Sequence, residues 1–400
     1  MSSKDWQNIS LAEVSEKIGM GPFGSNIKVE TFVSSGVPVI SGQHLRNCVL
    51  EDTTFNYVTE EHAQKLISAN VYRGDVVFTH AGNIKNVSYI PENSHHNRYV
   101  LSQRQFFVRP KKEKLNPAYL TYFFHSTQGQ YLLLANSTQV GVPSIAQPIT
   151  YFKNLKFLLP AIDEQDKIVK ILGDLDHKIK LNRKMNETLE QIGQTLFKKY
   201  FYDNPEREEW RDGTILDLGN VVTGKTPSKS DATYYGNDVM FLKVPDMHGN
   251  MIVIKTADNL STKGADSQSN KYLTKWSTCV SCIATVGVVS LAGNILQTNQ
   301  QINSIIPKDE SYTFYNYYLL RNKSDLLQMM ASAGSTTPNL NKSQFEKIKV
   351  KLPPSESLSE FQDKLQCIFE IIHKNYRETE ALSKIRDYLL PKLISGQIAV

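Results

Sequence analysis

The sequence predicts an α+β protein in which two mixed α/β modules alternate with two long helices that form an antiparallel coiled coil. One observation is a duplication: residues 152–201 recur at 345–394, 193 positions later and without a gap. Another is spacing, since apolar residues inside both copies recur at helical intervals, whereas short apolar runs typical of strands precede each copy. Together they predict a pseudo-twofold internal repeat.

Identical residues mark matching positions of the two copies. They are Phe152 and Phe345, Lys156 and Lys349, Leu159 and Leu352, Leu172 and Leu365, Asn182 and Asn375, Glu187 and Glu380, Ile192 and Ile385, and Lys199 and Lys392. Most other pairs preserve apolar character. A tandem pair of this kind can fold about an approximate twofold axis, which suits a ligand that is itself nearly twofold, such as duplex DNA.

Composition limits the class of protein. With 400 residues and 40% apolar content, the chain can form two or three cores. The net charge of +5 permits nucleic-acid binding only where Lys and Arg cluster. Four cysteines and a polar N-terminus without a leader favour a reducing cytoplasm. The longest apolar stretch, 279–296, is interrupted by Gly287 and Gly293, so we expect buried strands there and no membrane segment.

The first module begins with short strands and ends with helices. Strands are expected at 37–40, 76–78 and 106–108, because each is a short apolar run bounded by Gly, Pro or charged residues. Asn116 and the following proline predict a helix cap and first turn. The helix is expected to continue through 122–133.

Each long helix carries a heptad pattern. The apolar positions are Ile168, Leu172, Leu175, Ile179, Leu189 and Leu196 in the first, and Phe361, Leu365, Ile368, Ile372, Leu382 and Leu389 in the second. Asn182 and Asn186 interrupt the first pattern, and Asn375 interrupts the second at the matching point. Polar residues at such positions fix register and partner choice, so we expect the two helices to pair with each other.

The second module echoes the first loosely. Residues 39–40 correspond to 240–241, 101–105 to 297–301, and 141–145 to 335–340. The predicted boundaries are therefore 1–160 for the first module, 161–205 for the first helix, 206–353 for the second module and 354–400 for the second helix. A helix of this size is roughly 60 Å long, so the pair would act as a ruler between the modules.

Four phrases, in this order, resemble the DNA-specificity subunits of type I restriction-modification enzymes. They are Leu159–Gln165 at the start of the first helix, Gly224–Ser228 in the second module, Thr298–Gln301, and the ending Leu390–Gln397. The resemblance covers the whole chain. It implies two target-recognition domains, each recognising one half of a split, asymmetric sequence in double-stranded DNA. It also implies that the helical spacers bind two methyltransferase (modification) subunits and, through them, the restriction (endonuclease and translocase) subunits.

The first module departs from the family pattern. Gly19–Ser25 replaces the Gly-Lys-Thr-Pro-Ser phrase, and Ser102–Gln105 replaces Thr-Asn-Gln-Gln. The second helix has Ser357-Leu358 where the first has Glu164-Gln165. The resemblance implies a non-catalytic recognition subunit, and we expect no cofactor.

Candidate DNA contacts are amide and basic side chains near strand ends, because Arg, Lys, Asn and Gln contact base edges and phosphates. In the first module they are Gln43, His44, Arg46, Lys85, Arg98, Gln103 and Arg104. In the second they are Lys225, Lys229, Lys243, Lys263, Lys271, Lys275, Asn299, Gln300 and Gln301. The amides at matching places have a second interpretation, namely that they satisfy buried backbone groups.

Two other function classes remain open on sequence alone. Residues 219–226 match the phosphate-loop pattern, which would make the chain a nucleotide-binding enzyme, although Pro227 makes a poor helix start. A coiled-coil scaffold without DNA binding is the second alternative. Asn116–Tyr119 resembles a methyltransferase motif but is better explained as a helix cap, and Cys279 with Cys282 lacks a second pair for zinc.

Overall fold

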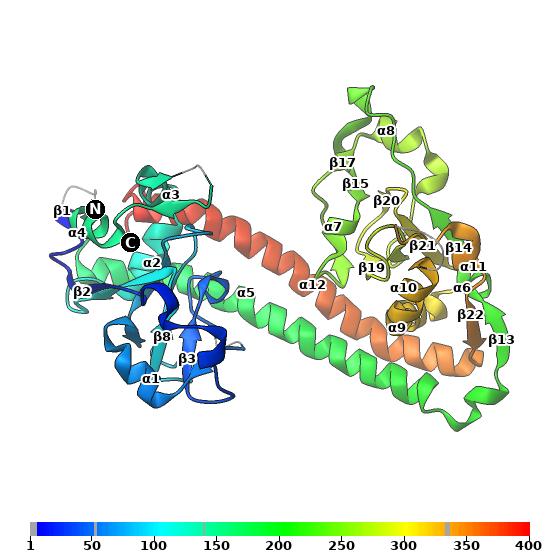
Figure 1. Cartoon of the computed structure of the whole chain (residues 1–400). Helices are drawn as coiled ribbons and strands as arrows, with labels where there is room; N and C mark the ends of the chain where they lie inside the picture. Colours follow the sequence, from blue (N-terminus) through cyan, green and yellow to red (C-terminus); the bar gives the residue numbers. More distant parts are fainter. Residues whose placement is uncertain (1–5, 52–53, 139–140, 333–336) are drawn as a thin grey trace. The chain divides into compact units, whose positions relative to one another are not determined.

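The computed structural model describes residues 6–51, 54–138, 141–332 and 337–400. Figure 1 shows the chain coloured along its sequence. Two long helices, α5 (Ile162–Phe197) and α12 (Ser355–Ile394), each contribute to both of the compact units into which the chain divides.

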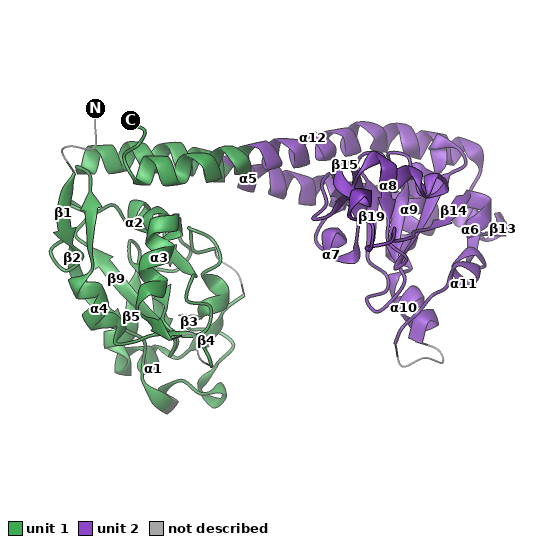
Figure 2. Cartoon of the chain, turned by 90° about the horizontal axis from the view of Figure 1, so that it is seen from above, with its two compact units in different colours: residues 1–177, 382–400 green, residues 178–381 purple. Residues whose placement is uncertain are grey.

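Unit 1 contains residues 1–177 and 382–400, and unit 2 contains 178–381 (Figure 2). Each unit therefore combines one module with a stretch of both long helices. The second module lies between its two helical segments in the sequence, whereas both helical segments of unit 1 follow the first module.

Two four-stranded sheets form the first module. One has the antiparallel order β2 (Ser15–Met20), β9 (Gln105–Pro110), β6 (Val76–Thr79) and β7 (Val87–Tyr89). The other has the order β4 (Asn56–Val58), β3 (Val37–Ile40), β8 (Arg98–Leu101) and β5 (Asn70–Tyr72). In the second sheet, β3 and β8 run parallel. The predicted strands at 37–40, 76–78 and 106–108 are confirmed as β3, β6 and part of β9.

Helices and short pairings complete the first module. They are α1 (Glu60–Lys65), α2 (Pro117–His125), α3 (Thr127–Ala135), α4 (Pro148–Asn154), the β10 (Ser137–Thr138) and β11 (Ser144–Ile145) pair, and the β1 (Gln7–Ser10) and β12 (Lys156–Leu159) pair. Phe124 of α2 packs edge-on against Phe78 of the sheet, with ring centroids 5.0 Å apart. On its other side, Tyr122 donates to Asp176 of α5 at 2.8 Å. Helix α2 therefore joins the sheet to α5.

The predicted helix through 122–133 is two helices, not one. Ser126 ends α2 and caps α3, since its hydroxyl accepts from the Gly129 amide at 3.2 Å. A Cβ on Gly129 would lie 2.0 Å from the Phe123 carbonyl oxygen, so the sharp turn requires glycine there. The predicted cap at Asn116 is confirmed, because its side-chain oxygen accepts from the amides of Ala118 and Tyr119.

The second module repeats this architecture. Its larger sheet has the order β14 (Gly219–Thr223), β21 (Ile302–Pro307), β18 (Thr278–Ser281), β19 (Val289–Ala292) and β16 (Ile252–Val253). The smaller sheet has the order β17 (Asn259–Leu260), β15 (Tyr235–Leu242) and β20 (Leu296–Thr298), with β15 and β20 parallel. The helices are α6 (Ile215–Leu218), α7 (Val244–Met247), α8 (Thr262–Asp266), α9 (Thr313–Asn322), α10 (Ser324–Ser332) and α11 (Lys342–Glu346).

Strand pairing supports the internal repeat. β1 pairs with β12 so that Gln7 faces Leu159, and β13 (Arg211–Thr214) pairs with β22 (Lys349–Leu352) so that Arg211 faces Leu352. The order β2-β9-β6-β7 recurs as β14-β21-β18-β19. Each pairing immediately precedes a long helix, as the duplication predicts.

Helices α5 and α12 pack antiparallel within each unit. In unit 2, Asn186 accepts from Asn375 at 2.8 Å, and Tyr200 donates to Glu360 at 2.6 Å. In unit 1, Arg386 donates to Asp176 at 2.8 Å. As residue numbers increase along α5, those of the bonded residues on α12 decrease, so the two helices run in opposite directions. The predicted pairing of the two helices is confirmed, while coiled-coil packing along their length stays a prediction.

Candidate nucleic-acid interface

Each module has a tight turn that joins its two sheets. In the first module, the turn at 102–104 links β8 to β9, and in the second, the turn at 299–301 links β20 to β21. The Gly21 amide donates to the Gln105 carbonyl at 2.8 Å, and the Gly224 amide donates to the Ile302 carbonyl at 3.1 Å. The two turns therefore have the same backbone neighbours.

Glycine is required beside both turns. A Cβ on Gly21 would lie 2.1 Å from the Ser102 carbonyl oxygen, and one on Gly224 would lie 2.2 Å from the Asn299 carbonyl oxygen. Real Cβ atoms do not approach backbone this closely, so any side chain would displace the turn. The glycine-rich phrases that differ between the modules thus share one steric role.

The hydrogen bonds show that the sequence comparison aligned the two turns one residue out of register. The residues of the second turn that are equivalent to 102–104 are numbered one higher than that comparison gave. Ser102 donates to the Ile40 carbonyl at 2.8 Å, and Asn299 donates to the Leu242 carbonyl at 3.1 Å. The amides three positions later donate back to Ser102 and Asn299. Ser102 is therefore equivalent to Asn299, Gln103 to Gln300, and Arg104 to Gln301. The strand pair 39–40 likewise corresponds to 241–242.

Two loops of the first module, the segment after β3 and the loop between β6 and β7, meet at its turn. Asn86, in the loop between β6 and β7, donates to the Gly42 carbonyl at 2.9 Å. His80 of the same loop lies 3.1 Å from the Gln103 carbonyl oxygen. The structure therefore brings together the segments that carry Gln43, Lys85, Gln103 and Arg104, and all four of these side chains are exposed. Sequence reasoning missed Asn86 and His80.

The remaining candidates of the first module differ in availability. Arg46 is exposed. Arg98 forms an ion pair with Glu60 of α1. His44 is only 8% exposed, its Nδ1 accepts from the Ser41 amide at 2.9 Å, and burial lowers its pKa. His44 therefore stabilises the turn after β3 and does not project from it. This favours the interpretation in which such side chains satisfy backbone groups.

In the second module, Gln300 lies in the turn and Lys225 lies beside it. The Lys225 amide donates to the Thr298 carbonyl at 2.9 Å, and Thr226 donates to Gln300 Oε1 at 2.6 Å. Gln268, which is buried, supports the loop by donating to the Lys225 carbonyl at 2.8 Å. This residue was missed because it lies 43 positions away in the sequence.

The other candidates of the second module are dispersed. Lys229 is exposed, Lys271 is half-buried, and Lys243 forms an ion pair with Asp258. Lys263 donates to Thr233 at 2.7 Å, and Lys275 lies over the Trp276 ring at 4.5 Å, at the start of β18 and away from the turn.

Asn299 is 7% exposed and satisfies its own turn. Its side-chain oxygen accepts from the Gln301 amide at 3.1 Å, and its Nδ2 donates to Gln301 Oε1 at 2.9 Å. Like His44, it shapes the turn.

Comparison with known proteins identifies the family. The model of the type I restriction modification DNA specificity domain matches residues 3–191 and again 207–388. The chain belongs to this family.

Two curated relatives are named as specificity subunits of type I restriction enzymes. The specificity subunit of the type I restriction enzyme HindI of Haemophilus influenzae is 31% identical, over 98% of this chain and 100% of that protein. The MjaIX specificity subunit of Methanocaldococcus jannaschii is 29% identical over 44% of this chain and 42% of its own length. The crystal structure of a type I system S subunit from M. genitalium has the same fold, with a TM-score of 0.64, 14% identity and coverage of 97% and 96%.

The phosphate-loop interpretation is not supported. Residues 219–223 are strand β14, and the next helical turn begins only at Ala232, so no helix N-terminus follows the glycines. The amides of Gly224 and Lys225 are already bonded to the carbonyls of Ile302 and Thr298. The loop instead carries Lys225 past the turn.

The cysteine pair is part of the core. Burial raises the pKa of Cys279 to about 12 and that of Cys282 to about 11, so both thiols stay protonated and are poor metal ligands. Within the described residues, no group of three His, Cys, Asp or Glu side chains is placed to hold a metal ion. None of the helices in the described ranges is long and apolar enough to cross a membrane.

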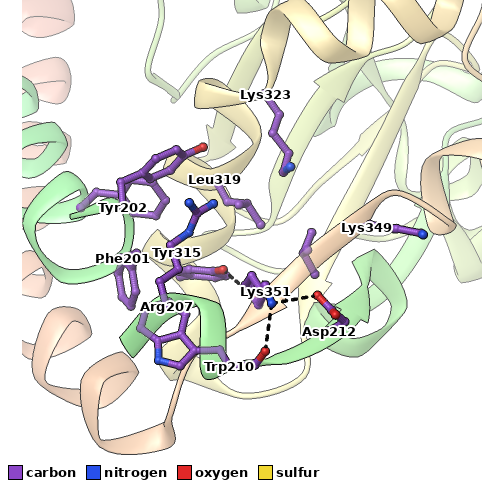
Figure 3. A pocket seen from close by; sticks show the side chains of 12 residues that line it. Phe201, Tyr202, Arg207, Trp210, Asp212, Tyr315, Leu319, Lys323, Lys349 and Lys351 are labelled. Carbon is purple, nitrogen blue, oxygen red and sulfur yellow. Dashed lines mark hydrogen bonds and ion pairs between the residues drawn. The ribbon is translucent and has the colours of Figure 1, made fainter. Parts of the chain in front are cut away.

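A cavity of about 140 Å³ lies where the end of α5 meets the second module (Figure 3). Aromatic side chains and several cations form its wall. Lys351 donates to the carbonyls of Glu208 and Trp210 at 3.1 and 3.3 Å and pairs with Asp212 at 3.3 Å. Burial and the nearby Arg207 lower the pKa of Lys323. Lys351 thus fastens β22 to the segment after α5.

Proposed function

We propose that the two modules recognise two different halves of one split DNA target, each through its β8–β9 or β20–β21 turn. The observation that carries this proposal is the equivalence of the turns. Their backbone bonding is shared, whereas Gln103 and Arg104 stand where the second module has Gln300 and Gln301. Arg prefers guanine and Gln prefers adenine in the major groove, so the same scaffold would select different bases.

Basic side chains around the turns would contact phosphate. Lys85 and Arg46 of the first module and Lys225 of the second are exposed and belong to segments near the turns, and Lys229 is exposed in the segment that follows Lys225. Phosphate contacts release counterions, so binding should weaken steeply as salt rises. Because His44 and Asn299 are buried, we assign them to holding the turns, and we rank Lys263, Lys271 and Lys275 below the turn residues.

We further propose that α5 and α12 space the modules and bind two methyltransferase subunits, through which restriction subunits join. Exposed apolar side chains support this. On α5 they are Ile171, Leu181, Met185 and Ile192, and on α12 they are Ile371, Ile385 and Tyr388. Ile192 and Ile385 are equivalent in the repeat, so one kind of partner surface would fit both helices. Contiguous exposed apolar patches mark protein interfaces, and we propose that these residues form the apolar part of such a surface.

Some of the charged side chains of the two helices form ion pairs within the chain. Lys178 pairs with Glu378 of the other helix at 3.4 Å, and Glu380 pairs with Lys255 of the second module at 2.8 Å. These carboxylates are therefore engaged within the chain. The apolar residues remain the better candidates for binding a methyltransferase subunit in the cytoplasm, where we propose that the complex acts.

A binding experiment tests the proposed function. The full chain, with its methyltransferase subunits, is titrated against a labelled duplex carrying the whole target and against duplexes carrying each half alone. The whole target should bind at least about tenfold more tightly than either half, since two linked sites bind with high effective concentration. Equal binding to random duplex would overturn the proposal. The scaffold alternative predicts no shift with any duplex.

A further inference from the structure

The turn before β18 has a left-handed backbone at a tryptophan. Trp276 has φ +70°, a conformation that side-chain-bearing residues rarely adopt and bulky ones least of all. In the first module the equivalent residue is Gly74, with φ +88°. Gly74 donates to the Ile90 carbonyl at 2.8 Å, and Trp276 donates to the Ala292 carbonyl at 2.8 Å, so the turns are bonded alike.

The flanking bonds confirm this equivalence. Asp75 donates to the Tyr72 carbonyl in one module, and Ser277 donates to the Thr274 carbonyl in the other. The first module thus uses the residue that such a turn favours, and the second does not. A strained conformation persists only where surrounding contacts determine it, so the contacts of the Trp276 ring need an explanation.

Those contacts join the second module to α12. The Trp276 ring lies edge-on to Phe369 and His373 of α12, with centroids 6.4 and 5.6 Å away, and to Phe314 of α9 at 5.8 Å. Phe314 in turn stacks on Phe369 at 4.2 Å. Trp276 therefore lies at the joint between a sheet of the module and the helix.

Two further contacts continue along α12 from this joint. The Met251 amide donates to the Tyr376 hydroxyl at 3.2 Å, and Lys255 pairs with Glu380 at 2.8 Å. Phe369, His373, Tyr376 and Glu380 follow one another at helical spacing, so they share one face. The aromatic contact and the polar contacts together fix how the second module is tilted on α12.

The first module lacks the aromatic contact. Asp176 of α5 is equivalent to Phe369, and it accepts from Tyr122 of α2 at 2.8 Å instead of packing against a ring from the turn. Gly74 has no side chain that could contact α5. The two modules, alike in fold, are thus held on their helices by different means, and among the described residues the strained aromatic residue belongs to the second module.

We propose that Trp276 is a positioning residue that holds the second module at one angle on α12 and so restricts the separation of half-sites that the chain accepts. This inference rests on the proposed function. Trp276 lies at the start of β18, whereas the β20–β21 turn is approached by the loop that follows the other end of this strand, since Cys282 donates to the Gln301 carbonyl at 2.8 Å. A change of tilt at Trp276 would therefore move the turn along the DNA.

The test is a spacing profile. Full chain and methyltransferase subunits are titrated against duplexes in which the target halves stand at the native separation or one base pair closer or further apart. Wild type should prefer the native separation by about tenfold or more, and Trp276→Gly, which relieves the backbone, should reduce this preference to about threefold or less. Trp276→Phe should restore the wild-type profile. Leu216→Ala, at an exposed site on α6, is the control and should match wild type.

A second variant distinguishes loss of the Trp276 contact from misfolding of Trp276→Gly. His373→Ala removes one of the two α12 side chains that the ring contacts and leaves the turn intact, so it should broaden the profile in the same way. If wild type discriminates spacing and both variants, folded by circular dichroism, discriminate equally well, the role of Trp276 is overturned while the proposed function stands. If wild type binds the whole target no better than its halves at any separation, the proposed function itself fails.

Discussion

Asn182 and Asn375 occupy equivalent positions 193 residues apart, and each donates its side-chain amide across the helix pair. Asn182 donates to Glu378 at 2.8 Å and contacts Thr379 at 3.5 Å, and Asn375 donates to Asn186 at 2.8 Å. Thr379 is itself equivalent to Asn186. The buried polar layer of unit 2 thus repeats about the approximate twofold axis, and it defines which residues of α5 face which residues of α12.

Removing one partner of this layer should cost more than removing both. Asn375→Leu leaves the Asn186 oxygen buried without its donor, and we expect the free energy of unfolding to fall by about 1–3 kcal/mol. In the double variant with Asn186→Leu, apolar packing replaces both amides, and most of the loss should be recovered. Urea unfolding followed by circular dichroism measures the cycle. Additive losses would show that the two amides are not coupled.

Gly193→Ala should destabilise unit 2. A Cβ at this position of α5 would lie 2.0 Å from the Tyr318 hydroxyl, so ring or helix must move, and we expect a loss of about 1–3 kcal/mol. Gly173→Ala is the matched control on the same helix, because its Cβ would lie 4.0 Å from the Tyr122 hydroxyl. There alanine should stabilise the helix by up to about 1 kcal/mol. Equal melting temperatures for the two variants would contradict the packing described for α9.

Lys225→Ala and Gln300→Ala should affect DNA binding differently. Loss of a phosphate contact weakens binding to all sequences alike and lowers the salt slope by about 1, whereas loss of a base contact relaxes one position of the target. Fluorescence anisotropy over a salt series, with a panel of single-base variants, separates the two effects. Lys364→Ala, at a lysine paired with Glu360 on α12, is the control. If neither turn variant differs from it, the assigned interface is wrong.

The stability of unit 2 should depend on His373. Burial, together with nearby Lys275 and Arg377, lowers the pKa of His373 below its ordinary value. The unfolded chain therefore binds a proton that the folded one resists, so stability is fully present above about pH 6.5 and decreases as the pH falls below it. The difference in urea midpoint between pH 7.5 and 5.5 should shrink in His373→Gln and stay unchanged in His177→Gln, an exposed site on α5. An unchanged difference in His373→Gln would count against the half-buried position of His373.

Local patterns in the sequence predicted much of the fold. The repeat, the long helices, the cap at Asn116 and the buried strand at 278–281 all follow from residue spacing and type. The break at Ser126 did not, because the apolar pattern continues across it and only the close approach of Gly129 to α2 requires it. The one-residue shift at the second turn is likewise set by hydrogen bonds that no alignment of two short loops reveals.

The candidate interface was less predictable. Sequence reasoning grouped Gln103 and Arg104 with Gln43 and Lys85, and the structure places their segments together. It could not separate exposed Gln300 from buried Asn299, since burial depends on neighbours distant in the chain. Trp276 gave no signal at all, because its residue type disfavours the backbone it adopts. Whether any candidate contacts DNA stays a prediction.

The two-half recognition of DNA is tested most directly by mapping methylated bases in the host genome with the chain present and deleted. We predict that deletion removes methylation from one split motif, whose two unlike halves are separated by a fixed number of unspecified base pairs. Methylation that disappears from a continuous motif, or methylation that does not depend on the chain, would contradict it.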